Sequence, residues 1–183
     1  MNNYEIYSAG VLPYTIFKGT VYFLLGRDAD NKWSDFGGRV EPKDRGDYEA
    51  TAAREFFEET LGSVYDYDYT RKLLKKIIKI NSKTGSGHAY YMYLLKISYT
   101  DIIRTKFLST KNFINNTIVS IDKKYVEKND IRWVSLETIE HSIEGKSLIN
   151  LRNVFSYTFK NCKDEINSIL NVFLQKDYNK LMN

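Results

Sequence analysis

The sequence predicts an α/β domain, in the broad α+β sense, built around a mixed β-sheet. Short segments in which polar and apolar residues alternate, as strands require, are mixed irregularly with longer segments of helical apolar spacing. The chain has 183 residues, 43% of them hydrophobic, which is enough for one domain with a substantial core. Aromatic residues make up 15% of the chain, which argues against a disordered protein.

The expected strands occur in both halves of the chain and are separated by glycine-containing turns. They span residues 8–12, 21–25, 73–80, 88–97 and 131–134. The turns are expected at Lys18-Gly19, between the first two strands, and at Thr84-Gly85-Ser86-Gly87, between the third and fourth. Residues 33–39 are expected to form a loop around the paired glycines.

The clearest helix is expected over Asp47 to Leu61, where Asp47 is a suitable N-cap and Gly62 can end the helix in the left-handed conformation. Residues 102–118 are ambiguous, and we interpret them as an inserted helical segment. Ser135 is expected to begin a short helix. Helical spacing then runs from residue 148 onward, with a break near 161–163.

The helix at residues 47–61 places Glu55, Glu58 and Glu59 on one face, because a helix advances about 100° per residue. The opposite face is expected to pack into the core and holds Ala50, Ala53, Phe57 and Leu61. Three neighbouring carboxylates on the outer face repel one another unless a cation lies among them. Magnesium is the fitting ion, since it prefers oxygen ligands. The alternative interpretation is an ordinary solvated helix face.

Two segments around this helix resemble the Nudix box, G-x5-E-x7-R-E-U-x-E-E-x-G-U, where U is bulky and apolar. They read Gly37-Gly38-Arg39-Val40-Glu41-Pro42 and Arg54-Glu55-Phe56-Phe57-Glu58-Glu59-Thr60. The lead-in from Trp33 and the late segment from Glu127 to Leu136 also resemble the family. The resemblance covers roughly residues 8 to 140. It implies a Nudix-type α/β/α sandwich over residues 1–147, with residues 148–183 as a C-terminal helical extension packed on the same domain.

The sequence departs from the family pattern in the connection between the two segments. Asp44 stands where the family has glutamate, and Arg54 follows it by ten residues instead of eight, which implies an insertion of about two residues. The family uses that acid to brace the loop against the arginine, and either Asp44 or Asp47 could fill the role. Leu61 occupies the second glycine position, one residue before Gly62.

The resemblance implies a role for each matched residue. The magnesium ligands, for which manganese can substitute, would be Glu55, Glu58, Glu59 and the Gly37 carbonyl. Arg54 would orient the glutamates, and Glu127 would be a further carboxylate or the general base, with Asp122 and Asp130 as second choices. The implied substrate contacts are Trp33, Gly38 and Arg39.

The implied activity is magnesium-dependent hydrolysis of a pyrophosphate bond in a nucleoside diphosphate linked to another moiety. We favour a small nucleotide or a dinucleoside polyphosphate as the substrate, because no long stripe of arginine or lysine stands out. One alternative is an enzyme that removes the cap from RNA, which the formal charge of +4 and the lysines of the C-terminal segment would suit. The second alternative is a Nudix-like nucleotide-binding module without catalysis.

The sequence also suggests a compartment. Cys162 is the single cysteine, so no disulfide forms within the chain, and a reducing environment is the simpler interpretation. No signal peptide or membrane-spanning run is evident at the start or in the longest apolar run. We therefore expect a cytoplasmic protein with no membrane partner.

Overall fold

A mixed β-sheet forms the centre of the protein. The computed structural model describes residues 7–181 apart from 86, 118–119, 121, 123–124 and 147, and it describes side chains as far as residue 172. The strand order is β3-β2-β1-β6-β5, with β4 pairing with β1 and β7 pairing with β2. The strands are β1 (Tyr7–Phe17), β2 (Thr20–Asp28), β3 (Trp33–Ser34), β4 (Phe36–Arg39), β5 (Lys79–Lys83), β6 (Ala89–Lys96) and β7 (Lys128–Ser135).

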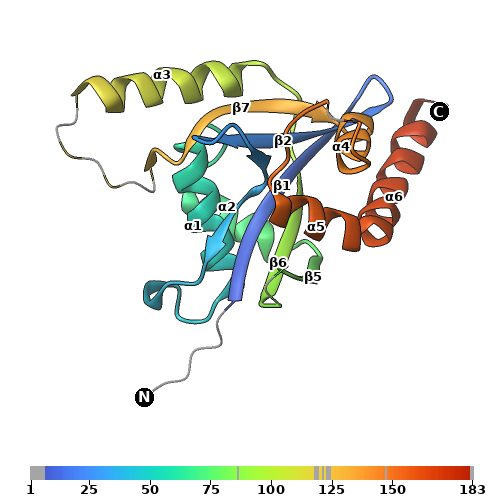
Figure 1. Cartoon of the computed structure of the whole chain (residues 1–183). Helices are drawn as coiled ribbons and strands as arrows, with labels where there is room; N and C mark the ends of the chain where they lie inside the picture. Colours follow the sequence, from blue (N-terminus) through green and yellow to red (C-terminus); the bar gives the residue numbers. More distant parts are fainter. Residues whose placement is uncertain are drawn as a thin grey trace.

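Helices cover both faces of this sheet. Strands β1 and β6 run parallel, and the remaining pairs are antiparallel. Figure 1 shows α1 and α2 on one side of the sheet, α5 and α6 on the other, and α3 alongside β7. The helices are η1 (Pro42–Asp44), α1 (Tyr48–Thr60), α2 (Tyr67–Leu74), α3 (Ile102–Thr117), α4 (Leu136–Ile143), α5 (Asn153–Asn161) and α6 (Lys163–Leu181).

Two apolar clusters, one on each face of the sheet, make this an α/β/α sandwich, as predicted. One cluster joins Phe23 and Leu25 of β2 to Phe155 and Phe159 of α5. The other contains side chains of α1 and α3. Helices α5 and α6 thus contribute to a core shared with the sheet, while the division of the chain at residue 147 stays a prediction.

The buried face of α1 matches the predicted one only in part, since Ala50 and Ala53 are buried as expected. Phe56 is fully buried and lies edge-on to Phe36 of β4, with 5.5 Å between the ring centroids, whereas Phe57 and Leu61 are only partly buried. Glu58 and Glu59 are buried as well. The prediction of an exposed acidic stripe was wrong because β4 and the loop after it cover this side of α1, a contact that helical periodicity alone does not reveal.

Two other predicted segments differ in the structure. Residues 33–39 form β3 and β4 instead of a loop, because the paired glycines align with β1, Gly37 opposite Gly10. The expected strand over 73–80 begins only at Lys79, because α2 extends to Leu74. Asp66 caps α2 by accepting a hydrogen bond from the Tyr69 N–H at 2.7 Å.

The helix expected from residue 148 onward begins only at Asn153, and the other expected elements are present. The turn between β5 and β6 is closed by the Gly87 N–H, which donates to the Thr84 carbonyl at 2.8 Å. Ser86, predicted within that turn, and Ile118, predicted to end the inserted helix, lie outside the described residues. Ser135 caps α4 as expected. Among the described helices, none has the length and apolar character needed to span a bilayer.

Replacing Phe56 with alanine should lower the free energy of unfolding by about 3–5 kcal/mol, since it removes a fully buried ring and leaves a cavity. Phe57→Ala, in the next residue of α1, should cost less than half as much, because its ring is only partly buried. Equilibrium urea denaturation of both variants tests this. Equal losses would contradict the packing described for α1.

Candidate functional site

The Arg54 guanidinium is the centre of a group of acidic side chains on α1 and the loop before it. Its Nη1 lies 2.7 Å from Glu55 Oε1, 3.2 Å from Glu58 Oε2 and 3.3 Å from Glu41 Oε1. Its Nη2 donates to the Arg39 carbonyl at 2.9 Å. The side chain of Arg54 is 7% exposed, so these contacts are poorly screened by solvent. Burial opposes its charge, but the surrounding carboxylates outweigh this and raise the pKa of Arg54 above its ordinary value.

Asp44 braces the loop against Arg54. Its carboxylate accepts from Arg54 Nε at 3.1 Å and from Nη2 at 2.9 Å, a bidentate contact. It also accepts from the Glu41 N–H at 2.9 Å and the Thr51 hydroxyl at 3.0 Å. Burial would raise the pKa of Asp44, but the hydrogen bonds from Arg54 and Glu41 lower it below its ordinary value. Of the two acids considered from the sequence, Asp44 therefore meets the arginine.

Asp47 has a different position. It caps α1, accepting from the Ala50 N–H at 2.8 Å, and its other oxygen pairs with Arg71 of α2 at 2.5 Å. The extra residues between Asp44 and α1 form a tight turn in which Arg45 and Gly46 both have positive φ, 53° and 76°. This turn absorbs the insertion, and Asp44 keeps its contact with Arg54.

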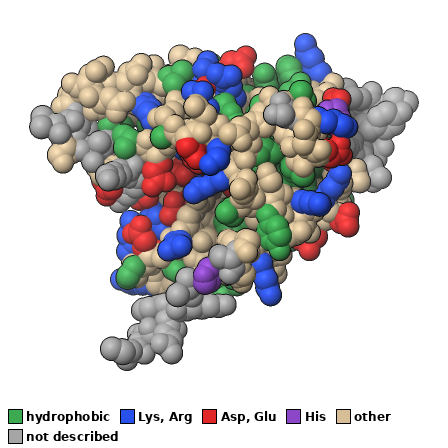
Figure 2. Space-filling model, in the orientation of Figure 1, with side chains coloured by type: hydrophobic (Ala, Val, Ile, Leu, Met, Phe, Trp, Pro, Cys, Tyr) green, Lys and Arg blue, Asp and Glu red, His purple; other side chains and the backbone are tan. Residues whose placement is uncertain are grey.

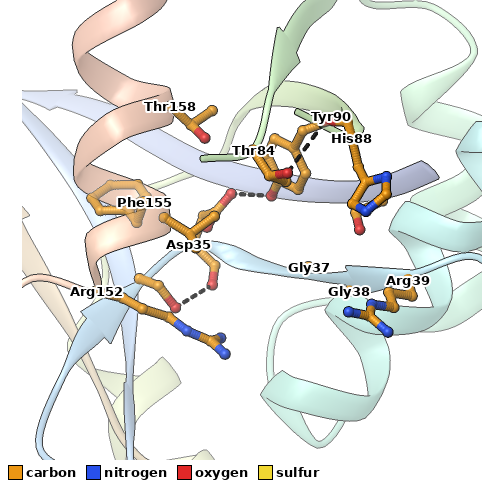
Figure 3. A pocket seen from close by; sticks show the side chains of 13 residues that line it. Asp35, Gly37, Gly38, Arg39, Thr84, His88, Tyr90, Arg152, Phe155 and Thr158 are labelled. Atoms are coloured by element: carbon orange, nitrogen blue, oxygen red, sulfur yellow. Dashed lines mark hydrogen bonds between the residues drawn. The ribbon is translucent and has the colours of Figure 1, made fainter. Parts of the chain in front are cut away.

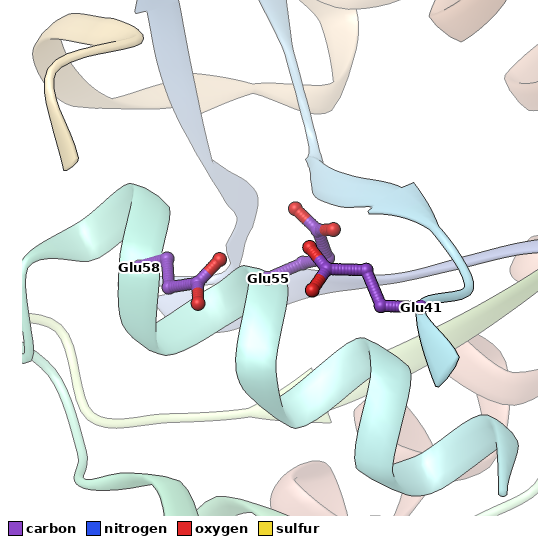
Figure 4. A group of neighbouring side chains, drawn as sticks. All are labelled: Glu41, Glu55 and Glu58. Carbon is purple, nitrogen blue, oxygen red and sulfur yellow. The ribbon is translucent and has the colours of Figure 1, made fainter. Parts of the chain in front are cut away.

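Three carboxylates of this group lie close enough to hold one cation. Oxygens of Glu41, Glu55 and Glu58 lie within 4.8 Å of one another. Figure 4 shows Glu41 reaching from the loop after β4 toward Glu55, with Glu58 one helical turn along α1. Carboxylate oxygens are the donors that magnesium prefers, so this set fits the predicted metal. Glu41 was not among the predicted ligands, although it belongs to the motif segment that begins with the paired glycines.

The surroundings of Glu55 raise the pKa of its carboxyl group above the ordinary value. Burial is the largest cause that raises the pKa of Glu55, and Glu58 and Glu127 add to it, while Arg54 opposes them. Figure 2 shows acidic side chains gathered on the left of the molecule, below α3, with basic side chains among them. A bound cation would relieve this repulsion.

Glu59 occupies a separate position from these three glutamates. One of its oxygens accepts from the Gly37 N–H at 2.8 Å, and the other lies 3.3 Å from Lys128 Nζ. Burial raises the pKa of Glu59 to about 8, although Lys128 opposes the shift. The ligand roles of Glu59 and of the Gly37 carbonyl stay predictions, and the structure pairs Glu59 with a cation of the chain itself.

Lys128, which the sequence analysis did not single out, is the most buried lysine near the site. Besides Glu59, its ammonium lies 2.7 Å from Asp28 Oδ1 and donates to Ser34 Oγ at 2.8 Å. Burial would lower the pKa of Lys128, but Glu59 and Asp28 outweigh it and raise the pKa. No spacing rule indicates this lysine, because β7 brings it to Glu59 from far along the chain.

The paired glycines fit the site for steric reasons. A methyl group on Gly38 would lie 2.5 Å from the Glu55 carboxyl carbon, and one on Gly37 would lie 2.7 Å from the Tyr90 hydroxyl. Any larger residue would displace Glu55 or separate β4 from its neighbours. The glycines therefore let the strand pass directly over the carboxylates.

The other predicted residues are divided between this site and its surroundings. Glu127 is exposed, just before β7, and its charge acts on Glu55. Asp122 is exposed, and Asp130 is engaged by Arg104 at 2.8 Å and Arg132 at 2.9 Å. Trp33 is buried between the guanidinium groups of Arg27 and Arg132, at 5.6 and 5.5 Å from its ring centroid.

A cavity of about 230 Å³ lies on the other side of β4 from α1. Gly38 and Arg39 line it, together with Asp35, Tyr90 and Phe155 (Figure 3), while the role of Gly38 and Arg39 as substrate contacts stays a prediction. The Tyr90 hydroxyl donates to Asp35. Burial raises the pKa of Asp35 above its ordinary value.

Comparison with known proteins identifies the fold. No protein-family model matches the sequence. An uncharacterized protein of Acanthamoeba polyphaga mimivirus is 45% identical over 62 residues, which span 29% of this chain and 19% of that protein. The NUDIX domain of Shewanella oneidensis NrtR, solved with ADP ribose, aligns with a TM-score of 0.53 at 12% identity, over 88% of each chain. This chain has the Nudix fold.

The Nudix fold agrees with the α/β/α sandwich expected from the resemblance. An Ap4A hydrolase of C. elegans also aligns, with a TM-score of 0.48 at 16% identity, over 89% of this chain and 98% of that one. Within the Nudix fold of this chain, α1 and the loop after β4 carry the acidic group, and Asp44 and Arg54 join them.

Asp44→Ala should cost more stability than Asp47→Ala. The first removes a bidentate partner from a buried guanidinium and should lower the free energy of unfolding by about 2–4 kcal/mol. The second removes a helix cap and a partly exposed ion pair, at about 1 kcal/mol. Thermal and urea denaturation of both variants would measure the difference, and the reverse order would show that Asp47 is the brace.

Proposed function

We propose that this protein is a magnesium-dependent pyrophosphohydrolase that acts on a nucleoside diphosphate linked to another moiety. The observation that supports it best is the convergence of Glu41, Glu55 and Glu58 on one buried guanidinium, directly beneath a glycine strand with a cavity on its far side. Arg54 and Lys43 offset part of the negative charge of these carboxylates, and a magnesium ion, which a phosphate-cleaving enzyme needs, would offset the rest. Among substrates of this class, we favour a small nucleotide or a dinucleoside polyphosphate.

In the proposed reaction, water attacks one phosphorus of the pyrophosphate and the bond to the bridging oxygen breaks. The products are a nucleoside monophosphate and a phosphorylated remainder. Glu41, Glu55 and Glu58 would hold the ion, and Arg54 fixes their carboxylates through its planar guanidinium. When bound, magnesium polarises a phosphoryl oxygen and assists the deprotonation of water.

Glu127 is the proposed general base. It is exposed beside Glu55 and makes no ion pair with any side chain in the described part of the chain. It is therefore available to accept the proton of the attacking water. Lys128, the next residue, is fixed by its buried ion pairs with Glu59 and Asp28, so the backbone that carries Glu127 is anchored.

Glu58→Gln should lower the rate of magnesium-dependent cleavage by at least about 100-fold, since even outer-shell changes at metal sites cost about 10–100-fold. The assay follows phosphate-bond cleavage across a panel of nucleoside diphosphate derivatives, dinucleoside polyphosphates and capped RNA. Glu137→Gln is the matched control, because Glu137 is exposed on α4. No activity in the wild type across the panel would favour the binding module, and equal activity in wild type and Glu58→Gln would refute the site.

A second candidate, cleavage of capped RNA, is favoured by one cluster of arginines. Arg27, Arg104 and Arg132 surround Asp130, with nitrogen-to-oxygen distances of 4.0, 2.8 and 2.9 Å. Three positive charges, from β2, α3 and β7, face one carboxylate of β7, which leaves an excess of two. Such an excess suits a substrate that carries phosphates beyond the one being cleaved.

Salt dependence separates the two candidates. If RNA contacts this cluster, the affinity for capped RNA should fall steeply with salt, and Arg104→Gln should reduce the logarithmic slope by about 0.7. Lys146→Gln, an exposed lysine paired with Glu144, should leave the slope unchanged. A slope that does not change in Arg104→Gln would count against the RNA substrate and favour the small nucleotide.

A further inference from the structure

The cavity beyond β4 is lined by the buried hydroxyl group of Thr158. Thr158 of α5 lines this cavity and is 1% exposed, and its Oγ1 has no hydrogen-bond partner within the described residues. In Figure 3 Thr158 lies on α5 above Phe155, facing the space in front of Asp35 and Tyr90. A buried hydroxyl without a partner costs about 1–3 kcal/mol, so the free protein carries a cost that a ligand atom would remove.

Phe155, Asp35 and Tyr90 line the cavity together with Thr158. Phe155 is 2% exposed and supplies an apolar surface next to the hydroxyl. The floor is the Asp35–Tyr90 pair, in which the tyrosine hydroxyl is already donated to the carboxyl group. The cavity volume of about 230 Å³ is below the roughly 300–1,000 Å³ of sites for drug-sized ligands. It therefore admits one ring system and not a whole dinucleotide.

The backbone of Gly38 separates the cavity from the Glu55 carboxylate. Gly38 lines it on one side, and Glu55 lies against Gly38 on the other, where a methyl group would clash. The exposed side chains of Arg39, His88 and Arg152 also line the cavity. The Glu55 carboxylate and the cavity that Thr158 lines therefore lie on opposite sides of Gly38, with basic side chains on the cavity side.

We propose that this cavity binds the heteroaromatic base of the substrate, with a ring nitrogen or exocyclic group hydrogen-bonded to Thr158 Oγ1 and the ring against Phe155. The phosphates then extend past Gly38 and Arg39 to Glu55. This assignment rests on the proposed function, since it gives the base to the substrate that Glu41, Glu55 and Glu58 cleave. It makes Thr158 a specificity-determining residue.

The test measures binding of four nucleoside 5′-monophosphates and of ribose 5-phosphate by calorimetry, with a chelator present so that the measured binding does not involve a metal ion. At least one nucleotide should bind at least tenfold more tightly than ribose 5-phosphate, which lacks the base. Thr158→Val should weaken that nucleotide about five- to tenfold and leave ribose 5-phosphate unchanged. Thr105→Val, an exposed threonine of α3, is the matched control.

A second measurement separates recognition from structure. Thr158→Val removes an unsatisfied hydroxyl without changing the side-chain shape, so the ligand-free variant should melt at a higher temperature than the wild type. A lower melting temperature would mean that the hydroxyl is bonded within the protein, and it would overturn the proposal. The proposal would also be overturned if Thr158→Val bound the nucleotide as tightly as the wild type does.

The outcomes also distinguish the two proposals. If Thr158→Val changes neither the rate nor the KM of magnesium-dependent cleavage, the proposed function stands and the proposed base site is refuted. If the protein binds a nucleotide selectively through Thr158 but cleaves nothing in the panel, the base site stands and the proposed function is refuted.

Discussion

The contact between Arg54 and Asp44 is the constraint on which the site depends. One guanidinium on α1 is held in a fixed plane by a carboxylate from the loop, and it then presents its remaining N–H groups to Glu55, Glu58 and the Arg39 carbonyl. Because the group is buried, each contact is directional and weakly screened. Loss of the brace would free the loop, the strand end and the glutamates together.

The acidic residues of α1 divide into two groups with different partners. Glu55 and Glu58 join Glu41 around Arg54, and they have the geometry to share an ion. Glu59 pairs instead with Lys128 and with the Gly37 N–H, so a cation of the chain already offsets its charge. The same helix therefore carries both a candidate metal site and an internal ion pair, which ties β4 and β7 to α1.

The sequence predicted the elements whose periodicity and caps are local, and it missed contacts made across the fold. The helix cap at Asp47, the hairpin turn after β5 and the helix at Ser135 follow from neighbouring residues, and all three were predicted correctly. The burial of Phe56 in place of Phe57, and the approach of Lys128 to Glu59, depend on which strands flank α1. Glu41 was missed as a potential ligand because its side chain reaches the helix only through the turn at η1.

The turn at Arg45 and Gly46 has a consequence for how such a site withstands changes in chain length. Both residues point into solvent and are exposed, and the ion pair closes the loop on one side of them while the helix cap closes it on the other. Lengthening a closed loop costs little, about 0.6 kcal/mol for each doubling, when the added residues lie between its fixed ends. Insertions at this turn should therefore be nearly neutral, whereas a single residue added between Gly38 and Asp44 would move the brace itself. Tolerance to insertion therefore depends on where the added residues lie relative to the Asp44–Arg54 ion pair and the Asp47 helix cap.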